Sequence, residues 1–413
     1  MPEIEKLYNQ NKKHLIGSEI PWLKEMRNNI LKELESTGIP SKKKETWKYS
    51  DLKHVRNVKY VFDESGIKNE RKDYFGDVNF INGKHISEIQ EDHIKNIFIE
   101  KLESNIINFE KYFSINSNFL SQDFITDLNT IFLTDGLTLS VPNNVKTDLK
   151  ITYSNNLNSI SSYIRNIIKV GKNSEFQLIE NFNKDNTEDN SSNVFNIFWL
   201  EEGAKVEHIL IQNAQQSSKI AYSSLIFCYD NSDFEQFSFQ CGSESVKNQH
   251  TTNLIGRRSS VKHYGVYFAK DAQFVDNKTT VIHHEQECKS NQIYKGVLSD
   301  ESNGVYLSNT LVKPEAQKTE GYQLSRGMLL SEKSVLKTKP ELKIYADDVK
   351  CSHGSTVGEI DREQLYYLQS RGINKKESEK LLIKAFTKDV LENMKNKESL
   401  NRIDEIIDDW LTE

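Results

Sequence analysis

Cysteine is scarce in this sequence, and the few cysteines do not cluster. The four of them, Cys228, Cys241, Cys288 and Cys351, are dispersed along 413 residues and form no Cys-x-x-Cys pair. Such spacing indicates neither a disulfide framework nor a self-contained site of four thiolates. Reduced thiols fit a protein of the cytoplasm.

Long apolar runs and a strong charge of one sign are also missing. No apolar run approaches the roughly 18 residues of a membrane span, and the opening residues, MPEIEKLYNQNKKH, lack the apolar region of a signal peptide. The net charge is -6, which gives no general electrostatic reason to bind nucleic acid or a membrane. The lysine run in SKKKETWKYSDL, residues 41–52, is interpreted as a solvated face. We expect a cytoplasmic protein that binds neither nucleic acid nor membrane.

The common catalytic motifs are absent as well. The chain has no G-x-x-x-x-G-K-[ST] loop, no G-x-G-x-x-G, no G-x-S-x-G and no H-E-x-x-H. The sequence therefore predicts a protein that is not an enzyme. A remote alternative is a β-helix enzyme acting on polysaccharide, with Asp347 and Asp348 as the acid and base. Consecutive residues of a strand point to opposite faces, which argues against that alternative.

What is present suits a globular protein of two or three domains, with 36% hydrophobic and 28% charged residues. Residues 1–134 are expected to be mostly helical, with apolar residues at helical spacing between Pro21 and Gly38. Residues 135–353 are predicted to form a β core. Residues 354–413 are predicted to be helical again.

The central segment repeats short runs rich in Ile, Val, Phe, Tyr and Thr, separated by turns with Gly, Asn or Asp. IRNIIKVGKNSEFQLIENF is one such unit. No insertion with a helical period is long enough for a crossover, which excludes a βαβ fold. Two folds remain, a β-sandwich and a parallel β-helix, and the periodicity does not decide between them.

The C-terminal segment contains signals for helix starts. Asp361 with Gln364, and Asn374 with Glu377, resemble capping boxes. The helices that follow have apolar stripes, which either pack within the chain or dock a partner. The stripes comprise Leu381, Leu382, Ala385, Phe386 and Leu391, and then Leu400, Ile403, Ile406, Ile407, Trp410 and Leu411.

The stretch 339–358, KPELKIYADDVKCSHGSTVG, is the most distinctive in the chain. Leu342 to Ala346 alternate as in a half-buried strand. If a strand continues through Cys351-Ser-His353, the thiol and the imidazole lie on one face, about 7 Å apart at the backbone. One metal centre could use both. The structural alternative makes Cys351 a small buried hydrophobe and His353 a hydrogen-bonded turn residue.

A second group of metal-capable residues is His283, His284, Glu285 and Cys288. Because adjacent residues of a strand face opposite ways, His283 and His284 cannot line one site without a bulge. We interpret this group as structural.

The stretch 339–358 closely resembles the signature of the SufD family, the non-ATPase subunit of the SUF machinery that assembles iron-sulfur clusters. Four other segments extend the likeness: ETWKY at 45–49, QKTEGYQLSRGMLLS at 317–331, LYYLQSRGI at 365–373 and LLIKAF at 381–386. The resemblance implies a mainly β fold, with a right-handed parallel β-helix flanked by N-terminal and C-terminal helical segments.

The resemblance also implies partners and a site. It makes His353 and Cys351 candidate metal ligands at an interface with the sister subunit SufB, where a transient iron-sulfur cluster is shared. It implies that the C-terminal helices dock the ATPase SufC, so that deletion of residues 374–413 should abolish SufC binding and leave the β core folded. No residue marks a flavin site.

One further alternative is a homodimeric SufB-like scaffold that acts without a sister subunit. The sequence around Cys351 is of the SufD kind, and the cysteine-rich segments expected of SufB are absent. A homodimer is nevertheless expected to be possible when SufB is missing.

Overall fold

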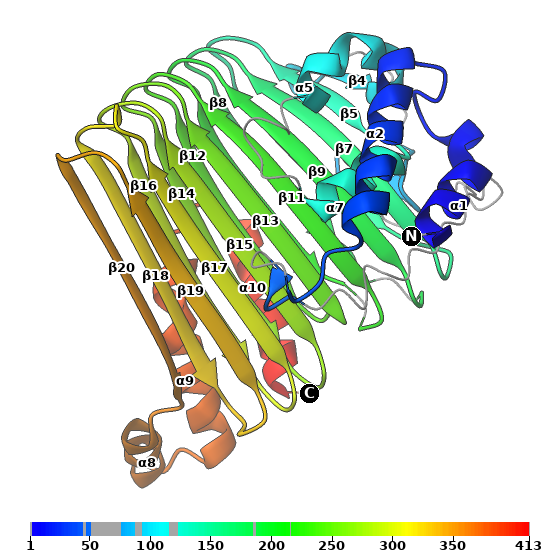
Figure 1. Cartoon of the computed structure of the whole chain (residues 1–413). Helices are drawn as coiled ribbons and strands as arrows, with labels where there is room; N and C mark the ends of the chain where they lie inside the picture. Colours follow the sequence, from blue (N-terminus) through cyan, green and yellow to red (C-terminus); the bar gives the residue numbers. More distant parts are fainter. Residues whose placement is uncertain are drawn as a thin grey trace.

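The computed structural model describes residues 2–43, 47–50, 76–86, 93–114, 123–184, 187–214 and 216–412. Two ten-stranded sheets lie face to face and form a solenoid. Figure 1 shows the strands stacked along one axis, with helices at both ends of the chain. From β5 onward, successive strands alternate between the two sheets, so that each turn of the chain adds one strand to each. The expected mainly β, parallel β-helix fold with flanking helices is confirmed.

We call the two sheets A and B. Sheet A consists, in spatial order, of β2 (Lys84–His85), β1 (Val78–Ile81), β6 (Lys146–Ser154), β8 (Glu175–Phe182), β10 (Lys205–Asn213), β12 (Asp233–Cys241), β14 (Ser260–Ala269), β16 (Lys289–Leu298), β18 (Thr319–Leu329) and β20 (Val349–Glu359). Sheet B consists of β19 (Val335–Ile344), β17 (Asn303–Val312), β15 (Phe274–His283), β13 (Ser245–Leu254), β11 (Lys219–Cys228), β9 (Ser191–Leu200), β7 (Ser161–Val170), β5 (Leu137–Val141), β4 (Ile97–Lys101) and β3 (His93–Ile94).

Neighbouring strands from β5 and β6 onward are parallel and in register, so equivalent residues of successive turns stack on one another. The turns between strands are tight because Asn173, Asn231 and Asp300 adopt left-handed backbone angles, with φ of 56°, 58° and 54°. Asn and Asp tolerate this conformation better than other residues with a side chain. These residues are among the Asn and Asp residues that mark the predicted turns in the sequence.

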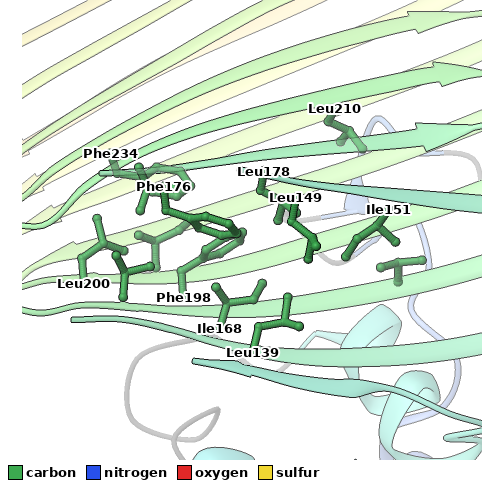
Figure 2. Close-up of a cluster of buried hydrophobic side chains, with 14 of the residues drawn as sticks. Leu139, Leu149, Ile151, Ile168, Phe176, Leu178, Phe198, Leu200, Leu210 and Phe234 are labelled. Atoms are coloured by element: carbon green, nitrogen blue, oxygen red, sulfur yellow. The ribbon is translucent and has the colours of Figure 1, made fainter. Parts of the chain in front are cut away.

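The lumen, which is the space between the two sheets, contains both apolar and polar side chains. Apolar side chains from both sheets form its main hydrophobic cluster, as Figure 2 shows for Leu149, Phe176 and Phe198. A row of polar residues also runs along sheet A, from His208 on β10 through Gln236, His263 and Gln292 to Gln323 on β18. The apolar cluster provides the main hydrophobic core.

The N-terminal helices cover the outer face of sheet B. Helix α2 (Pro21–Thr37) and helix α7 (Phe124–Ile131) bury their apolar residues there. Pro21 begins α2, and Gly38, with φ of 75°, ends it, as the sequence predicts. The other helices that the structure describes in this region are α1 (Pro2–Asn11), η1 (Lys12–His14), α4 (Leu102–Asn105), η3 (Ile106–Phe109) and α5 (Glu110–Ser114).

The C-terminal helices cover the outer face of sheet A. Helix α9 (Lys375–Leu391) and helix α10 (Lys397–Thr412) pack Ile383, Ile403 and Trp410 against strands β8 to β16. Lys295 Nζ on β16 lies 2.6 Å from Asp389 Oδ1 on α9. The apolar stripes of these helices are therefore largely internal packing. Deletion of 374–413 would therefore remove an apolar cover from the outer face of sheet A.

Helix α8 (Arg362–Ser370) differs, since it buries none of its residues. Asp361 caps it by accepting hydrogen bonds from Glu363 N and Gln364 N, and Asn374 caps α9 by accepting from Glu377 N. Both capping predictions are confirmed. In Figure 1, α8 stands clear of the sheets.

At the predicted domain boundaries, 134/135 and 353/354, the structure shows only how the neighbouring strands are arranged. β1, from the first segment, pairs with β6 of sheet A. At the other end, β20 runs past residue 353 to Glu359. Among the described residues, no helix is both long enough and apolar enough to cross a membrane.

Candidate metal-ligand site at the open end of the solenoid

The last turn of the solenoid is formed by β19 and β20. We call these two strands and the turn between them the open end. Each is the terminal strand of its sheet, and Figure 1 shows them at the end of the stack away from α1 and α2. Within the part of the chain that the structure describes, their outer backbone edges pair with no further strand. Such edges are templates for strand pairing.

The inward face of β20 holds both candidate ligands. Cys351 is in register with Gly321 of β18, and His353 is in register with Gln323. A Cβ atom at Gly321 would lie 3.2 Å from Cys351 Sγ, so the thiol sits directly above that glycine. The predicted strand through Cys351-Ser-His353, with both side chains on one face, is confirmed.

The two side chains differ in their surroundings. Cys351 is half-buried and packs with Val312, Ala316 and Ala346. Burial raises the pKa of its thiol, although the nearby backbone N–H of Gly321 opposes the effect. His353 is exposed. An incoming group therefore meets the imidazole first, and the thiol must lose its proton to become a ligand.

Asp347 and Asp348 lie in the exposed turn before β20, not on a strand face. The backbone of Asp348 holds that turn: its carbonyl accepts a hydrogen bond from Lys318 N at 2.6 Å, and its N–H donates to Gln317 Oε1 at 2.9 Å. The backbone of Asp348 thus stabilises the turn, and the two exposed carboxylates do not face each other across a cleft as an acid–base pair would.

The group at 283–288 is divided between separate partners. His283 Nε2 is 2.9 Å from Ser290 Oγ, and burial lowers the pKa of His283 to about 3. His284 Nε2 is 3.0 Å from Asn253 Oδ1, while Cys288 Sγ is 3.2 Å from the carbonyl oxygen of Gly256. These contacts support the structural interpretation. No three His, Cys, Asp or Glu residues of the described ranges are grouped so that they could hold a metal ion.

Sequence reasoning missed the polar side chains beneath His353. Gln323 Nε2 donates to Thr310 Oγ1 at 2.8 Å, and Gln292 Nε2 donates to the same oxygen at 2.8 Å. Thr279 Oγ1 then donates to Gln292 Oε1 at 2.5 Å. A hydrogen-bonded row thus runs through the lumen and ends one turn below the candidate ligand.

Comparison with known proteins identifies the family of this chain. Residues 152–386 match the family model described as SUF system FeS cluster assembly, SufBD core domain, and residues 2–152 match the SufBD protein N-terminal region. The chain belongs to the SufBD family. The core match covers most of the solenoid together with α8 and much of α9.

Full-length relatives extend the likeness. The chain is 26% identical over 396 residues to "Iron-sulfur cluster assembly protein SufD" of Escherichia coli, covering 93% of this chain and 92% of the relative. It is 25% identical over 408 residues to the SufD protein of Bacillus subtilis, with 91% of each chain covered. It is 24% identical over 406 residues to "Protein ABCI7, chloroplastic" of Arabidopsis thaliana, covering 92% and 84%. The expectation of a SufD-type relationship is confirmed, and these SufD relatives are named as assembly proteins.

Proposed function

We propose that this chain is the SufD-type, non-ATPase scaffold subunit of an iron-sulfur cluster assembly complex, and that a SufB-type sister subunit binds at its open end. The observation that carries the proposal is the coincidence of two features in one place. The strand edges of β19 and β20 are available for pairing, and the exposed imidazole of His353 lies beside Cys351 on the last turn. A partner seated there would also cover these side chains.

The nascent cluster is the cargo of such a subunit, and its ligands must release it. Imidazole and thiolate both bind iron. Two ligands from this chain leave other coordination positions to the partner, so separation of the subunits would weaken the site. The low cysteine content of the chain agrees with such sharing.

Pairing is tested by mixing the chain with a SufB-type subunit and measuring the mass of the intact assembly by native mass spectrometry. A heterodimer in preference to a homodimer supports the proposal. A homodimer that persists in excess SufB-type subunit would favour the self-sufficient scaffold instead.

The ligand role is tested by reconstituting the complex with iron and sulfide at equal subunit stoichiometry. His353→Ala should lower the visible absorbance of the cluster severalfold, and Cys351→Ala should have an equal or smaller effect. His284→Ala and Cys288→Ala are the controls, because those side chains have internal hydrogen bonds away from the open end. Normal cluster yield with His353→Ala would remove this residue from the site.

We also propose that the SufC-type ATPase docks on α8 and the adjoining surface of α9. Tyr366 and Tyr367 are 73% and 57% exposed, and Leu381 of α9 is exposed as well. Large exposed aromatic side chains on a helix that contacts no core are typical of a docking surface. A Tyr366→Ala, Tyr367→Ala double variant should weaken SufC binding by at least tenfold. Tyr345→Ala, at another exposed tyrosine, is the matched control, and unchanged binding of the α8 variant would move the docking site elsewhere.

A further inference from the structure

The row of residues beneath His353 has a regular geometry. In sheet A, His263, Gln292, Gln323 and His353 occupy equivalent positions of successive strands, as the pairing of β14, β16, β18 and β20 shows. Strands in a sheet are about 4.8 Å apart, so side chains in one such row are direct neighbours. The next coil of the solenoid after that of Gln323 is the open end. In this coil, His353 occupies the position that is equivalent to Gln323.

The hydrogen bonds of Gln323 are incomplete on one side. Its Nε2 atom donates to Thr310 Oγ1 at 2.8 Å and to the carbonyl oxygen of Glu341 at 3.3 Å. Both hydrogens of the amide are therefore used. Its Oε1 atom is buried and accepts no hydrogen bond from the described residues. A buried acceptor without a donor carries a desolvation penalty, which a donor from a neighbouring side chain would offset.

Thr310 fixes which way the amide of Gln323 is turned. Its hydroxyl oxygen accepts from Gln323 and from Gln292, each at 2.8 Å, and Gln292 accepts in turn from Thr279. The amide group of Gln323 is thus held by two donated bonds from one side. Its oxygen is left as a buried acceptor without a donor, on a residue that is in register with His353 of the adjacent strand.

We propose that Gln323 is a positioning residue for His353: the exposed imidazole turns about its side-chain bonds so that one ring N–H donates to Gln323 Oε1, a hydrogen bond that the side-chain orientation in this structure does not make. This inference rests on the proposed function, in which His353 is a metal ligand. One ring N–H directed at Gln323 fixes the tautomer and leaves the lone pair of the other nitrogen facing away from the lumen, where a partner or metal approaches. Ligand histidines generally have such an acceptor behind them, and its loss lowers metal affinity by about 10–100-fold.

The first test reads the imidazole without any metal. The full-length chain is labelled with ¹⁵N-histidine, and the ring nitrogens of His353 are assigned as the signals lost in His353→Ala. Magic-angle-spinning NMR at pH 8 should show one tautomer in the wild type and a mixture of both in Gln323→Met. Gln323→Glu retains an acceptor and should restore the single tautomer. An unchanged tautomer in Gln323→Met overturns the proposal.

Gln292→Met is the matched control. It breaks the same hydrogen-bonded row one turn lower, at the same distance from Thr310, so it should leave the His353 tautomer as in the wild type. If it shifts the tautomer as much as Gln323→Met does, the row acts only as general packing and the proposal fails. Gln323→Ser, which withdraws the polar group from His353, is the second variant if Gln323→Met does not fold, and it is read by the same criterion.

The second test uses Co²⁺ as the probe, titrated into the full-length chain. Gln323→Met should weaken binding about tenfold, and it should have no further effect in a His353→Ala background. An equal effect in that background overturns the positioning role. If His353→Ala itself leaves Co²⁺ binding unchanged while Gln323→Met still alters the tautomer, the ligand role of His353 fails and the contact to Gln323 stands.

Discussion

Three buried histidines of the lumen are linked by hydrogen bonds to one glutamine. Gln236 lies between them: its Nε2 atom is 3.1 Å from His208 Nδ1 and 3.1 Å from His250 Nδ1, and its Oε1 atom accepts from His263 Nδ1 at 2.8 Å. An amide has two hydrogens and one acceptor oxygen, so in this orientation Gln236 donates to Nδ1 of His250 and accepts from Nδ1–H of His263.

The first prediction concerns acid. Burial, assisted by the charge of His208, lowers the pKa of His263 to about 3 from an unfolded value near 6.5. Between these values the unfolded chain binds more protons than the folded chain, so the free energy of unfolding falls as the pH falls through this range. At pH 5 this one residue accounts for a loss of about 2 kcal/mol relative to pH 7.

Urea unfolding at pH 7 and pH 5 measures the effect. His263→Gln should reduce the difference in stability between the two pH values by about 2 kcal/mol. Gln292→Met, one turn along the same row, removes no titratable group and should lower stability equally at both pH values. A His263→Gln variant with the full wild-type difference would show that another group titrates.

The placement of Cys351 and His353 could be predicted from the sequence because the alternation of a strand is local. The role of Gln323 could not, because it depends on how one turn stacks on the next. The hydrogen bond between Asn166 and Asn196 spans 30 residues, which is one turn of the solenoid. Without knowledge of that spacing, nothing in the sequence pairs Gln323 with His353.

At the scale of single strands, two glycines are required by the aromatic side chains of the lumen. A Cβ atom at Gly296 of β16 would lie 2.3 Å from Cε2 of Tyr267, which is fully buried. A Cβ at Gly265 of β14 would likewise lie 2.1 Å from Cε1 of Tyr294. Each tyrosine ring thus fills the space left by a glycine on the neighbouring strand.

The second prediction follows from this packing. Gly296→Ala should lower the free energy of unfolding by about 1–3 kcal/mol, because the rigid buried ring cannot move away. Gly358→Ala on β20 is the control, since its Cβ would meet nothing within 4 Å. Denaturant unfolding followed by circular dichroism measures both. Equal stability of the two variants would mean that the lumen around Tyr267 repacks freely.

For the C-terminal helices, the sequence predicts where a helix starts but not which surface it packs against. Asp361 and Asn374 predict the starts of α8 and α9, because a cap depends on residues three positions away. The apolar stripe of α10 does not reveal its partner. Trp410 packs on Phe268 of β14, with ring centroids 5.1 Å apart, and a contact so distant in sequence has no local pattern.

The third prediction concerns removal of α9 and α10. Truncation before Asn374 should lower the thermal midpoint and increase binding of a hydrophobic dye, because it uncovers apolar residues on sheet A such as Phe237 and Phe239. The Tyr366→Ala, Tyr367→Ala variant alters only exposed residues and should melt like the wild type. A truncated chain with wild-type melting and dye binding would contradict the role of these helices as a cover for sheet A.

For the whole molecule, the sequence predicts strands and turns but leaves the choice between a sandwich and a parallel β-helix to family resemblance. The reason is physical. Both folds bury one face of short strands and expose the other, so both produce the same alternation. What distinguishes them is which strand pairs with which. In this chain β8 pairs with β6 and β10, and the intervening strands β7 and β9 lie in the opposite sheet.

The stacking also explains why the two ends of the solenoid differ. At the first end, the short antiparallel strands β2, β3 and β4 continue the sheets. At the open end, β19 and β20 end both sheets, and inward-facing residues such as Val357 remain 40% exposed. An open strand edge and apolar inward residues together favour association with another solenoid end.

The fourth prediction is that the isolated chain forms a homodimer through the open end when no sister subunit is present. Val357→Lys places a charge on the inward face of β20 and should raise the dissociation constant at least tenfold, because a buried, unpaired ammonium group opposes association. Tyr322→Lys is the control, since Tyr322 is 44% exposed but lies on the outer face of β18, one strand away from the edge. Sedimentation equilibrium of the three proteins should therefore show dimers for the wild type and the control and mainly monomers for Val357→Lys. A monomeric wild type, or equal dissociation of the control, would mean that the open end does not associate with its own copy, and the available edges of β19 and β20 would then be left to a different partner.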